Sequence, residues 1–267
     1  MSSMHCRACN GRLMDFASRG GFQIYKCEDC GFGQTNVTPE DIRHFYEKDY
    51  FDGKVARFSQ ADTEKADFAK AWWIDRSVRP GDVDCLEVGP GPAGMVAEYL
   101  RETRPAVKYE AVEVSEDASG VLRGRGFSVH TGKVYDSAIK SALHQKFDCV
   151  IATEVIEHDL DPESFIRGMY DALKQGGRAC LTTGNFDGLT ARVTGRNWYY
   201  LDPPAHVVFY TPRSVEKLFL GAGFSGVSVQ CVGLNYVRLH RKLPVPGLLK
   251  LIHALQVPTG MTICAVK

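Results

Sequence analysis

Short apolar runs alternate with amphipathic stretches over the last two thirds of the chain. The runs that favour strands are VDCLEV, KYEAVEV, FSVHT, FDCVIA, RACLTT and VSVQCV, and the final run, MTICAVK, is expected to form an edge strand. Helices are expected between these runs, because Ser115, Asp161 and Thr211 are good N-cap residues and the last two precede a proline. The alternation predicts an α/β fold whose doubly wound, mostly parallel sheet has helices on both faces.

The pattern divides the chain into three parts. Residues 1–40 form a small module, residues 41–80 a helical cap or linker, and residues 81–267 an α/β core with an insertion at about 184–210. The aromatic residues of the helical part include Phe68, Trp72 and Trp73, and they are expected to pack in the core rather than to line a substrate mouth.

Two C-x-x-C pairs lie within the first 30 residues. Cys6 and Cys9 form one pair and Cys27 and Cys30 the other, with 17 residues between them and a small residue after each second cysteine. This spacing is typical of a four-cysteine zinc ribbon, in which two tight turns converge on a tetrahedral ion. A dithiol redox centre is the alternative, but redox motifs come singly. The zinc is expected to be structural, because the module has too few apolar residues to fold alone.

Composition and charge exclude several classes of protein. The chain has 32 basic and 32 acidic residues, and this balance argues against broad, sequence-independent binding to nucleic acid. Residues 217–267 hold six basic residues and no acidic one, and we interpret this segment as a solvated face rather than an anion-binding surface. No run approaches the roughly 18–20 apolar residues of a membrane span, and the N-terminus lacks an apolar signal core.

The other five cysteines indicate a reducing environment. They lie in apolar stretches and are expected to be buried free thiols: Cys85, Cys149, Cys180, Cys231 and Cys264. With the absence of a signal core, this favours a cytoplasmic protein.

A glycine-rich turn follows the strand VDCLEV and precedes the helix MVAEYL. Gly89 and Gly91 let the backbone approach a ligand closely, and the helix offers free amides at its N-terminus. Glu113 ends the next strand, where a carboxylate can accept hydrogen bonds from the two ribose hydroxyls of a nucleoside. Such a turn alone is weak support for a nucleotide site, and Glu113 alone is equally compatible with a solvated acid.

Taken together, these residues resemble the class I S-adenosylmethionine (SAM) methyltransferases, which have a Rossmann-like fold. Glu87, Gly89 and Gly91 match the first motif of that family, although the usual third glycine is Ala93, with Gly94 one place later. The segment FDCVIATEVIEHDLDP is also similar to the family, and a nicotinamide enzyme would not explain it. The resemblance covers residues 80–267.

The resemblance implies a set of SAM-binding residues. Glu87 and the backbone around Gly89 and Gly91 would bind the methionine end of SAM, and Glu113 the ribose. Asp136 is the candidate for the adenine contact, though its surroundings fit loosely, and Thr153 completes the predicted set.

Two histidines follow the fourth and fifth strands of the predicted sheet. His158 belongs to Glu154-x-x-Glu157-His158, and His206 lies in the aromatic insertion NWYYLDPPAHVVFYTP. Either histidine could act as general base for a hydroxyl nucleophile, because imidazole exchanges protons near neutral pH. If the E-x-x-E-H segment is helical, its three polar residues share one face and could form a divalent-metal site with His206.

The E-x-x-E-H pattern resembles the metal motif of small-RNA 2′-O-methyltransferases and ubiquinone-pathway O-methyltransferases. A bound ion would lower the pKa of a hydroxyl. The alternative is a hydrogen-bonded Glu–His pair that orients a base without any metal.

The order of motifs looks most like bacterial methyltransferases of sugars and surface polysaccharides. That resemblance implies a small-molecule acceptor, a sugar or a nucleotide- or lipid-linked sugar, with Trp198, Tyr199 and Tyr200 stacked on sugar rings. An RNA methyltransferase is the second hypothesis, and the neutral pI counts against it. A zinc-ribbon interaction protein with a degenerate methyltransferase fold is the third. The stretch LPVPGLLKLIHALQV, a candidate membrane-surface helix, is expected to pack on the core.

Overall fold

A computed structural model describes residues 5–45, 73–74, 76–232 and 260–267. Most of the predicted helical cap therefore lies outside the described residues, as does the candidate membrane-surface stretch at 243–257. No helix of the described part is both long enough and apolar enough to cross a membrane.

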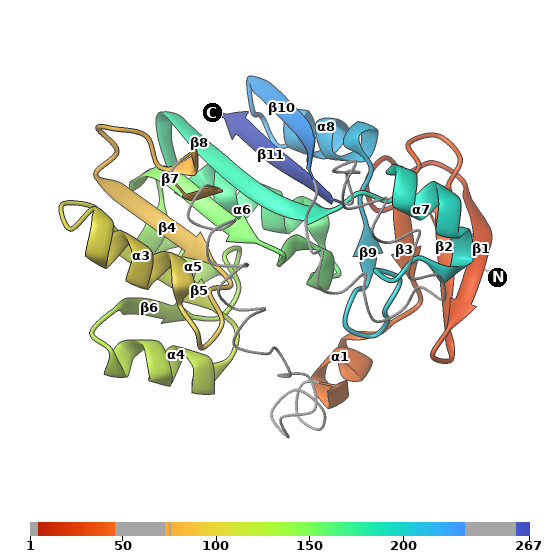
Figure 1. Cartoon of the computed structure of the whole chain (residues 1–267), viewed down its shortest axis with the longest axis horizontal. Helices are drawn as coiled ribbons and strands as arrows, with labels where there is room; N and C mark the ends of the chain where they lie inside the picture. Colours follow the sequence, from red (N-terminus) through yellow and green to blue (C-terminus); the bar gives the residue numbers. More distant parts are fainter. Residues whose placement is uncertain (1–4, 46–72, 75, 233–259) are drawn as a thin grey trace, which may run out of the picture.

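The core of the molecule is a seven-stranded sheet in the order β10-β11-β8-β7-β4-β5-β6. The five strands from β8 to β6 are parallel, whereas β11 is antiparallel to both of its neighbours, β8 and β10. The strands span Asp84–Val88 (β4), Lys108–Glu113 (β5), Ser128–Thr131 (β6), Phe147–Thr153 (β7), Leu173–Gly184 (β8), Gly226–Val232 (β10) and Gly260–Val266 (β11). The mostly parallel, Rossmann-like α/β sheet predicted from the sequence is confirmed (Figure 1).

Helices cover both faces of this sheet. They are α3 (Met95–Thr103), α4 (Glu116–Gly124), α5 (Ser137–Leu143), α6 (Pro162–Ala172) and α8 (Pro212–Gly221). The helix α3 packs on one face, while α5, α6 and α8 pack on the other, and α4 lies beside β5 and β6. The predicted caps are confirmed, because Ser115, Asp161 and Thr211 each accept a backbone N–H of the helix that they begin.

The expectation that the final strand forms an edge is wrong. The strand β11 lies between β8 and β10 and pairs with both along its length. Its run MTICAV is apolar on both faces and mostly buried, which is the pattern of an interior strand rather than of a half-solvated edge.

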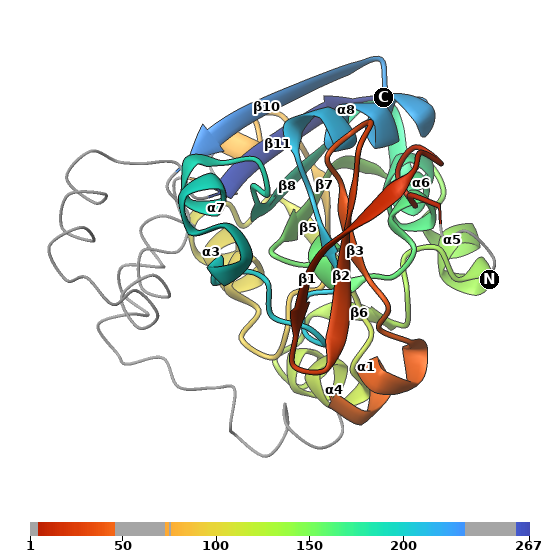
Figure 2. The same cartoon turned by 90° about the vertical axis from the view of Figure 1, so that its right-hand side faces the viewer.

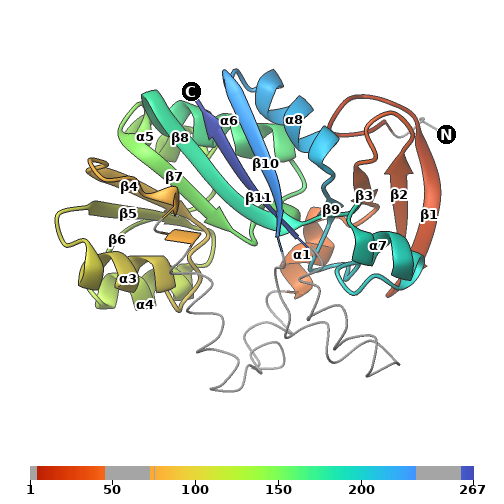
Figure 3. The same cartoon turned by 45° about the horizontal axis from the view of Figure 1, so that its top comes forward.

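The N-terminal module forms a second, four-stranded sheet in the order β1-β2-β3-β9. We call this the ribbon sheet; its strands are Leu13–Arg19 (β1), Phe22–Cys27 (β2), Gly33–Thr35 (β3) and Val208–Phe209 (β9). The helix α1 (Pro39–Phe45) follows β3, and α7 (Leu189–Thr194) lies beside the ribbon sheet (Figures 1 and 2). Because β9 comes from the insertion after β8, the ribbon sheet joins N-terminal strands to a strand about 170 residues further along the chain (Figure 3).

The two sheets share one hydrophobic core. Cys6, Cys27, Cys30 and Phe32 of the ribbon side belong to the same buried cluster as Val215 of α8. A second cluster joins the ribbon strands to the insertion through Ile24, Trp198, Tyr200 and Phe209. The N-terminal module therefore shares its hydrophobic core with the rest of the protein. The domain boundaries predicted at residues 40 and 80 stay predictions.

Candidate active site and metal centre

Four cysteine sulfurs meet at one end of the ribbon sheet. The Sγ–Sγ distances are 3.6 Å between Cys6 and Cys30, 3.5 Å between Cys9 and Cys27, and 3.3 Å between Cys9 and Cys30. A tetrahedral zinc ion with bonds of about 2.3 Å separates its sulfurs by about 3.8 Å, so a slight expansion admits the ion. The Cys₄ cluster predicted from the sequence exists and is compatible with zinc.

The turns around these cysteines have the expected local geometry. Asn10 and Gly31 follow the second cysteine of each pair and have left-handed φ angles of 59° and 73°. The backbone N–H of Ala8 donates to Cys6 Sγ at 3.4 Å. These residues turn the backbone tightly enough for amide dipoles to face the sulfurs. Of the cysteines predicted to be buried free thiols, Cys231 is exposed and Cys264 is half-buried, so the prediction is wrong for Cys231 and only partly right for Cys264.

The glycine-rich turn after β4 is packed against its surroundings. Gly89 has a φ of 71°, and a Cβ there would lie 2.7 Å from the side chain of Val155. Gly94, with a φ of 57°, begins α3, and a Cβ there would lie 2.5 Å from Leu122. The left-handed φ angles together with the short Cβ distances favour glycine at both positions.

Glu113 connects the end of β5 to the glycine-rich turn. Its carboxylate is buried and accepts the backbone N–H of Gly91 at 2.9 Å and that of Ser115 at 3.0 Å. A carboxylate has about four lone-pair positions, so both oxygens can accept further donors, such as ribose hydroxyls. The predicted ribose ligand therefore also holds the turn in place.

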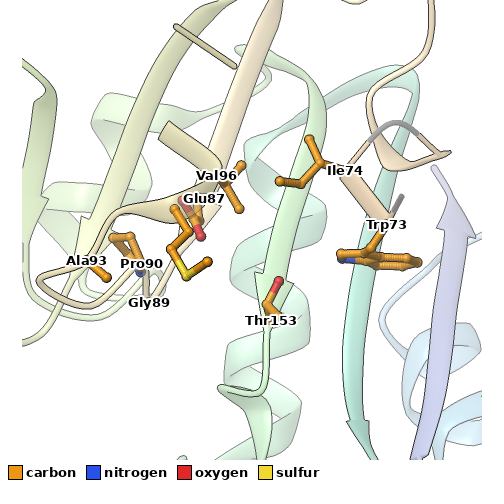
Figure 4. Close-up of a pocket in the computed structure, with 9 residues that line it drawn as sticks. Trp73, Ile74, Glu87, Gly89, Pro90, Ala93, Val96 and Thr153 are labelled. Carbon is orange, nitrogen blue, oxygen red and sulfur yellow. The ribbon is translucent and has the colours of Figure 1, made fainter. Parts of the chain in front are cut away.

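A pocket of about 430 Å³, counted with its open mouth, lies between the turn after β4 and the end of β7. Figure 4 shows its lining side chains, which include the predicted cofactor residues Glu87, Gly89 and Thr153. Sequence reasoning missed two residues here. Trp73 forms one wall, and Tyr109 donates its hydroxyl to Glu87 Oε2 at 2.6 Å from behind the pocket. Burial and the neighbouring Glu87 charge raise the pKa of Tyr109, so its phenol remains a donor.

Asp136, the candidate for the adenine contact, follows β6 as expected. It is exposed, and its Oδ2 accepts the backbone N–H of Lys133 at 2.7 Å at the start of α5. The residue does not line the pocket of Figure 4, and its adenine contact stays a prediction.

A second group of polar side chains lies just beyond the end of β7. Glu157, His158 and His206 each offer one ligand atom, and these atoms lie within 4.8 Å of one another. Glu157 and His206 are buried, whereas 30% of the His158 side chain is exposed. The structure thus brings together three of the four residues that the sequence assigned to a catalytic or metal site.

Backbone carbonyls orient both histidines. Each Nδ1 lies 2.7 Å from a carbonyl oxygen, that of Ala205 for His158 and that of Tyr200 for His206. A carbonyl can only accept, so each Nδ1 bears the proton in the neutral ring. Each Nε2 is then the atom that accepts a proton or a metal.

Glu154 does not join the group in the way that the sequence predicted. The segment is not an α-helix: a 3₁₀ turn, η2, spans Ile156–His158, and Glu154 precedes it with a left-handed φ of 54°. The expected shared helix face is therefore absent, and Glu154 lies outside the three-residue group. Its Oε2 instead lies 3.2 Å from the Tyr200 hydroxyl oxygen.

Two hydroxyl groups hold the Glu157 carboxylate in place, and no residue pattern pointed to either of them. Tyr200 donates to Glu157 Oε1, and Thr183 donates to Oε2 at 2.9 Å. Burial, and then the nearby charges of Glu154 and Glu157, raise the pKa of Tyr200, so the phenol stays protonated. The Tyr200 ring also packs on His206, with the ring centroids 4.2 Å apart.

The aromatic residues of the insertion are core residues, not an open platform for sugars. Trp198, Tyr199 and Tyr200 are 0%, 8% and 1% exposed. The Trp198 ring stacks between Phe186 and Tyr200. This arrangement corrects the expectation that the three rings contact a sugar, because no substrate can reach their faces.

Hydrogen bonds link the ribbon sheet to the histidine group. Val207, next to His206, donates its N–H to the Glu157 carbonyl at 2.9 Å, and its own carbonyl accepts from Thr35 of β3. The Thr211 hydroxyl donates to the Cys30 carbonyl at 2.7 Å. The insertion is therefore held between the Cys₄ cluster and the turn that contains Glu157.

Comparison with known proteins agrees with this geometry. A family model described as a methyltransferase domain matches residues 42–229, which is more than half of the chain. The chain belongs to the class I SAM-dependent methyltransferases. Members of this family transfer methyl groups, with SAM as the cofactor.

Two solved methyltransferases have the same fold. A SAM-dependent methyltransferase from Archaeoglobus fulgidus aligns over 82% of this chain and 99% of its own, with a TM-score of 0.57 and 17% identity. A geranyl diphosphate C-methyltransferase from Streptomyces coelicolor, solved with Mg²⁺, geranyl diphosphate and S-adenosylhomocysteine, aligns over 77% and 82%, with a TM-score of 0.56 and 14% identity.

Curated relatives align with this chain over a shorter stretch than the solved structures do. A ubiquinone biosynthesis O-methyltransferase from Pseudomonas fluorescens is 28% identical over 117 residues, which are 42% of this methyltransferase and 49% of that protein. The chain spans about half the length of the curated relatives that it matches, and the family match begins after the Cys₄ module.

Proposed function

We propose that this methyltransferase transfers the methyl group of SAM to a hydroxyl of a small molecule, with a sugar or sugar conjugate as the acceptor. The Glu157–His158–His206 group removes the hydroxyl proton. Glu87, Gly89, Gly91 and Glu113 bind the methionine and ribose parts of the cofactor, with Thr153 and Asp136 beside them.

One observation supports this proposal above the others: the base group adjoins the cofactor turn. Val155, the residue before η2, packs so closely on the turn that it leaves no room for a side chain at Gly89. A methyl donor bound on that turn and an acceptor held at η2 would therefore be neighbours. Methyl transfer needs this proximity, because the nucleophile must attack the sulfonium methyl in line.

The charges and exposures of the group suit a hydroxyl nucleophile. His158 is the partly exposed member, and its Nε2 lies 3.9 Å from Glu157 Oε1. The buried carboxylate stabilises the imidazolium that forms when His158 takes the acceptor proton. Buried His206 acts as a positioning residue beside the Tyr200 ring.

Incorporation of labelled methyl from SAM into fractionated cell extract tests the acceptor class. Label in small molecules or glycans would support the proposal, and label confined to RNA or protein would contradict the acceptor while leaving the enzyme class intact. A carbohydrate-degrading digestion that releases the label as a methylated monosaccharide would support the sugar acceptor. A labelled aromatic compound would contradict the proposal that the acceptor is a sugar. This is the main competing result, because the curated relatives are ubiquinone biosynthesis O-methyltransferases.

A divalent cation at the Glu157–His158–His206 group is the second candidate. The donor set fits a metal. Each histidine donates its Nδ1–H to a backbone carbonyl and keeps Nε2 for an ion, as metal-bound histidines do. Such an ion would supply Lewis-acid activation of the acceptor hydroxyl. Titration of Mn²⁺ into the chain and into His206→Ala tests it: saturable binding that the variant loses supports the site, and equal binding contradicts it.

We also propose that Cys6, Cys9, Cys27 and Cys30 bind a structural zinc ion. This ion would hold the end of the ribbon sheet to which Thr211 and the insertion are bonded. Metal analysis of the purified chain should give about one zinc per chain that survives mild chelation. A zinc-free, fully active chain would contradict the proposal.

A further inference from the structure

The cofactor pocket has two buried polar atoms for which the described residues provide no hydrogen-bond partner. They are Trp73 Nε1 and Thr153 Oγ1, and both residues line the pocket. Trp73 is 6% exposed, so its indole N–H is shielded from solvent. Figure 4 draws the ring with its nitrogen on the edge that faces Thr153. Buried polar groups in native proteins are nearly always paired, and these two differ from Trp198 Nε1 in lining one pocket, where a bound ligand would pair them.

The donors and acceptors in the pocket wall determine which hydrogen-bonding groups the ligand must have. An indole N–H can only donate, a carboxylate such as Glu87 can only accept, and a threonine hydroxyl can do both. The pocket therefore combines a pure donor on one wall with a pure acceptor on another, Glu87 Oε2 being already bonded to Tyr109. A zwitterionic amino-acid group fits this arrangement, because its carboxylate only accepts and its ammonium only donates.

We infer that Trp73 Nε1–H donates a hydrogen bond to the α-carboxylate of the methionine part of SAM, with the ammonium directed at Glu87 and Thr153. The inference rests on the proposed SAM site and adds to it a residue that selects for the amino-acid end of the cofactor. Trp73 thus has a binding role besides forming one wall of the pocket. Within the predicted cofactor set, Thr153 is the one residue whose side chain can donate a hydrogen bond, and Trp73 adds a second donor.

The inference predicts that the chain discriminates by the carboxylate. S-adenosylhomocysteine has the carboxylate, whereas decarboxylated S-adenosylhomocysteine and 5′-methylthioadenosine lack it. A hydrogen bond to a charged group is worth a factor of about 10 or more in affinity. Calorimetric titration of the full chain should therefore show S-adenosylhomocysteine binding at least about tenfold more tightly than its decarboxylated form.

The variant Trp73→Phe keeps an aromatic ring and removes the N–H. It should weaken S-adenosylhomocysteine binding about tenfold and change the affinity for 5′-methylthioadenosine less than about twofold. Trp198→Phe is the matched control for cofactor binding, because Trp198 also has a buried Nε1 without a described partner but belongs to the ribbon-side cluster. It should leave both affinities unchanged.

Each outcome of these titrations either supports or contradicts the hydrogen bond from Trp73. A selective loss for the carboxylate ligand supports the inference. An equal loss for both ligands, or no loss, contradicts it, and the first of these would leave Trp73 with a packing role only. Equal affinity of the unmodified chain for S-adenosylhomocysteine and its decarboxylated form contradicts it without any variant. If the unmodified chain binds none of the three ligands, the proposed SAM site itself is wrong.

Discussion

In the proposed site, the main cofactor residues come from one short stretch of sequence, whereas the acceptor residues come from segments far apart in the sequence. On the cofactor side, Glu87, the glycine turn and Glu113 belong to one strand–turn–helix–strand unit between residues 84 and 113. On the acceptor side, Glu157 meets His206 from an insertion that is itself paired to the N-terminal strand β3. Glu87, the turn and Glu113 thus form a local motif, to which Thr153 and Trp73 are added, whereas the acceptor side depends throughout on three distant segments.

This difference predicts how each side responds to damage. The cofactor side is held by short backbone contacts, such as the Gly91 N–H on Glu113. The acceptor side is held by packing and hydrogen bonds that pass through the ribbon sheet, so changes there should affect turnover more than SAM affinity. Four substitutions test the contrast, from the largest expected effect to the smallest.

Cys27→Ser should have the largest effect. A structural zinc site contributes about 10–16 kcal/mol of apparent binding free energy in small zinc domains, which is comparable to the whole stability of a typical protein. We expect the variant to lose zinc and to misfold, as measured by metal content and thermal unfolding. Cys231→Ser, at an exposed cysteine, is the control and should keep both. A soluble, active, zinc-free Cys27→Ser protein would disprove the structural role.

His158→Ala should lower kcat by about 10²–10⁴-fold while leaving S-adenosylhomocysteine affinity within about twofold. The reason is that His158 Nε2 is the proposed proton acceptor and does not line the cofactor pocket. Steady-state kinetics and calorimetry measure the two quantities on the same protein. His144→Ala, at an exposed histidine, should change neither. Unchanged turnover in His158→Ala would remove this residue from the mechanism.

Glu113→Ala should weaken SAM binding by about 10–100-fold, because the change removes the acceptor for the ribose and for the Gly91 and Ser115 amides. At saturating SAM, kcat should fall much less. Direct titration gives the affinity, and Glu116→Ala, on the exposed surface of α4, is the control. A Glu113→Ala protein with unchanged SAM affinity would break the proposed cofactor side.

Tyr200→Phe should have the smallest effect, a loss of about tenfold in kcat with SAM affinity retained, because one hydrogen bond to the Glu157 carboxylate is lost. The raised pKa of Tyr200 keeps its hydroxyl protonated, so the ratio of wild-type to variant kcat should stay constant between about pH 6 and 9. Tyr25→Phe, on β2, is the control. A ratio that falls towards one within this range would show that the phenol ionises there.

The sequence predicted the parallel sheet, its helix caps and the glycine turn, because each depends on neighbouring residues. It also predicted the four-cysteine cluster, since paired knuckles have a local spacing. It failed at Glu154, where a left-handed backbone breaks the helical spacing, and at the final strand, whose position depends on β10 and β8.

The contacts of Tyr200 and Thr183 with Glu157 could not have been predicted from residue patterns. These side chains meet only because β8, the insertion and η2 pack together, and no periodicity or spacing marks such a meeting. The aromatic insertion shows the same limit, because a run such as Trp198-Tyr199-Tyr200 has the same composition whether it faces a ligand or the core.

The contrast between the two sides is tested most directly by measuring methyl transfer and S-adenosylhomocysteine affinity in parallel for the unmodified chain, His158→Ala and Glu113→Ala. We expect His158→Ala to lose turnover and keep affinity, and Glu113→Ala to lose affinity and keep most of its turnover at saturating SAM. If both variants lose the two properties together, or if His158→Ala retains full turnover, the division into a cofactor side and an acceptor side is wrong.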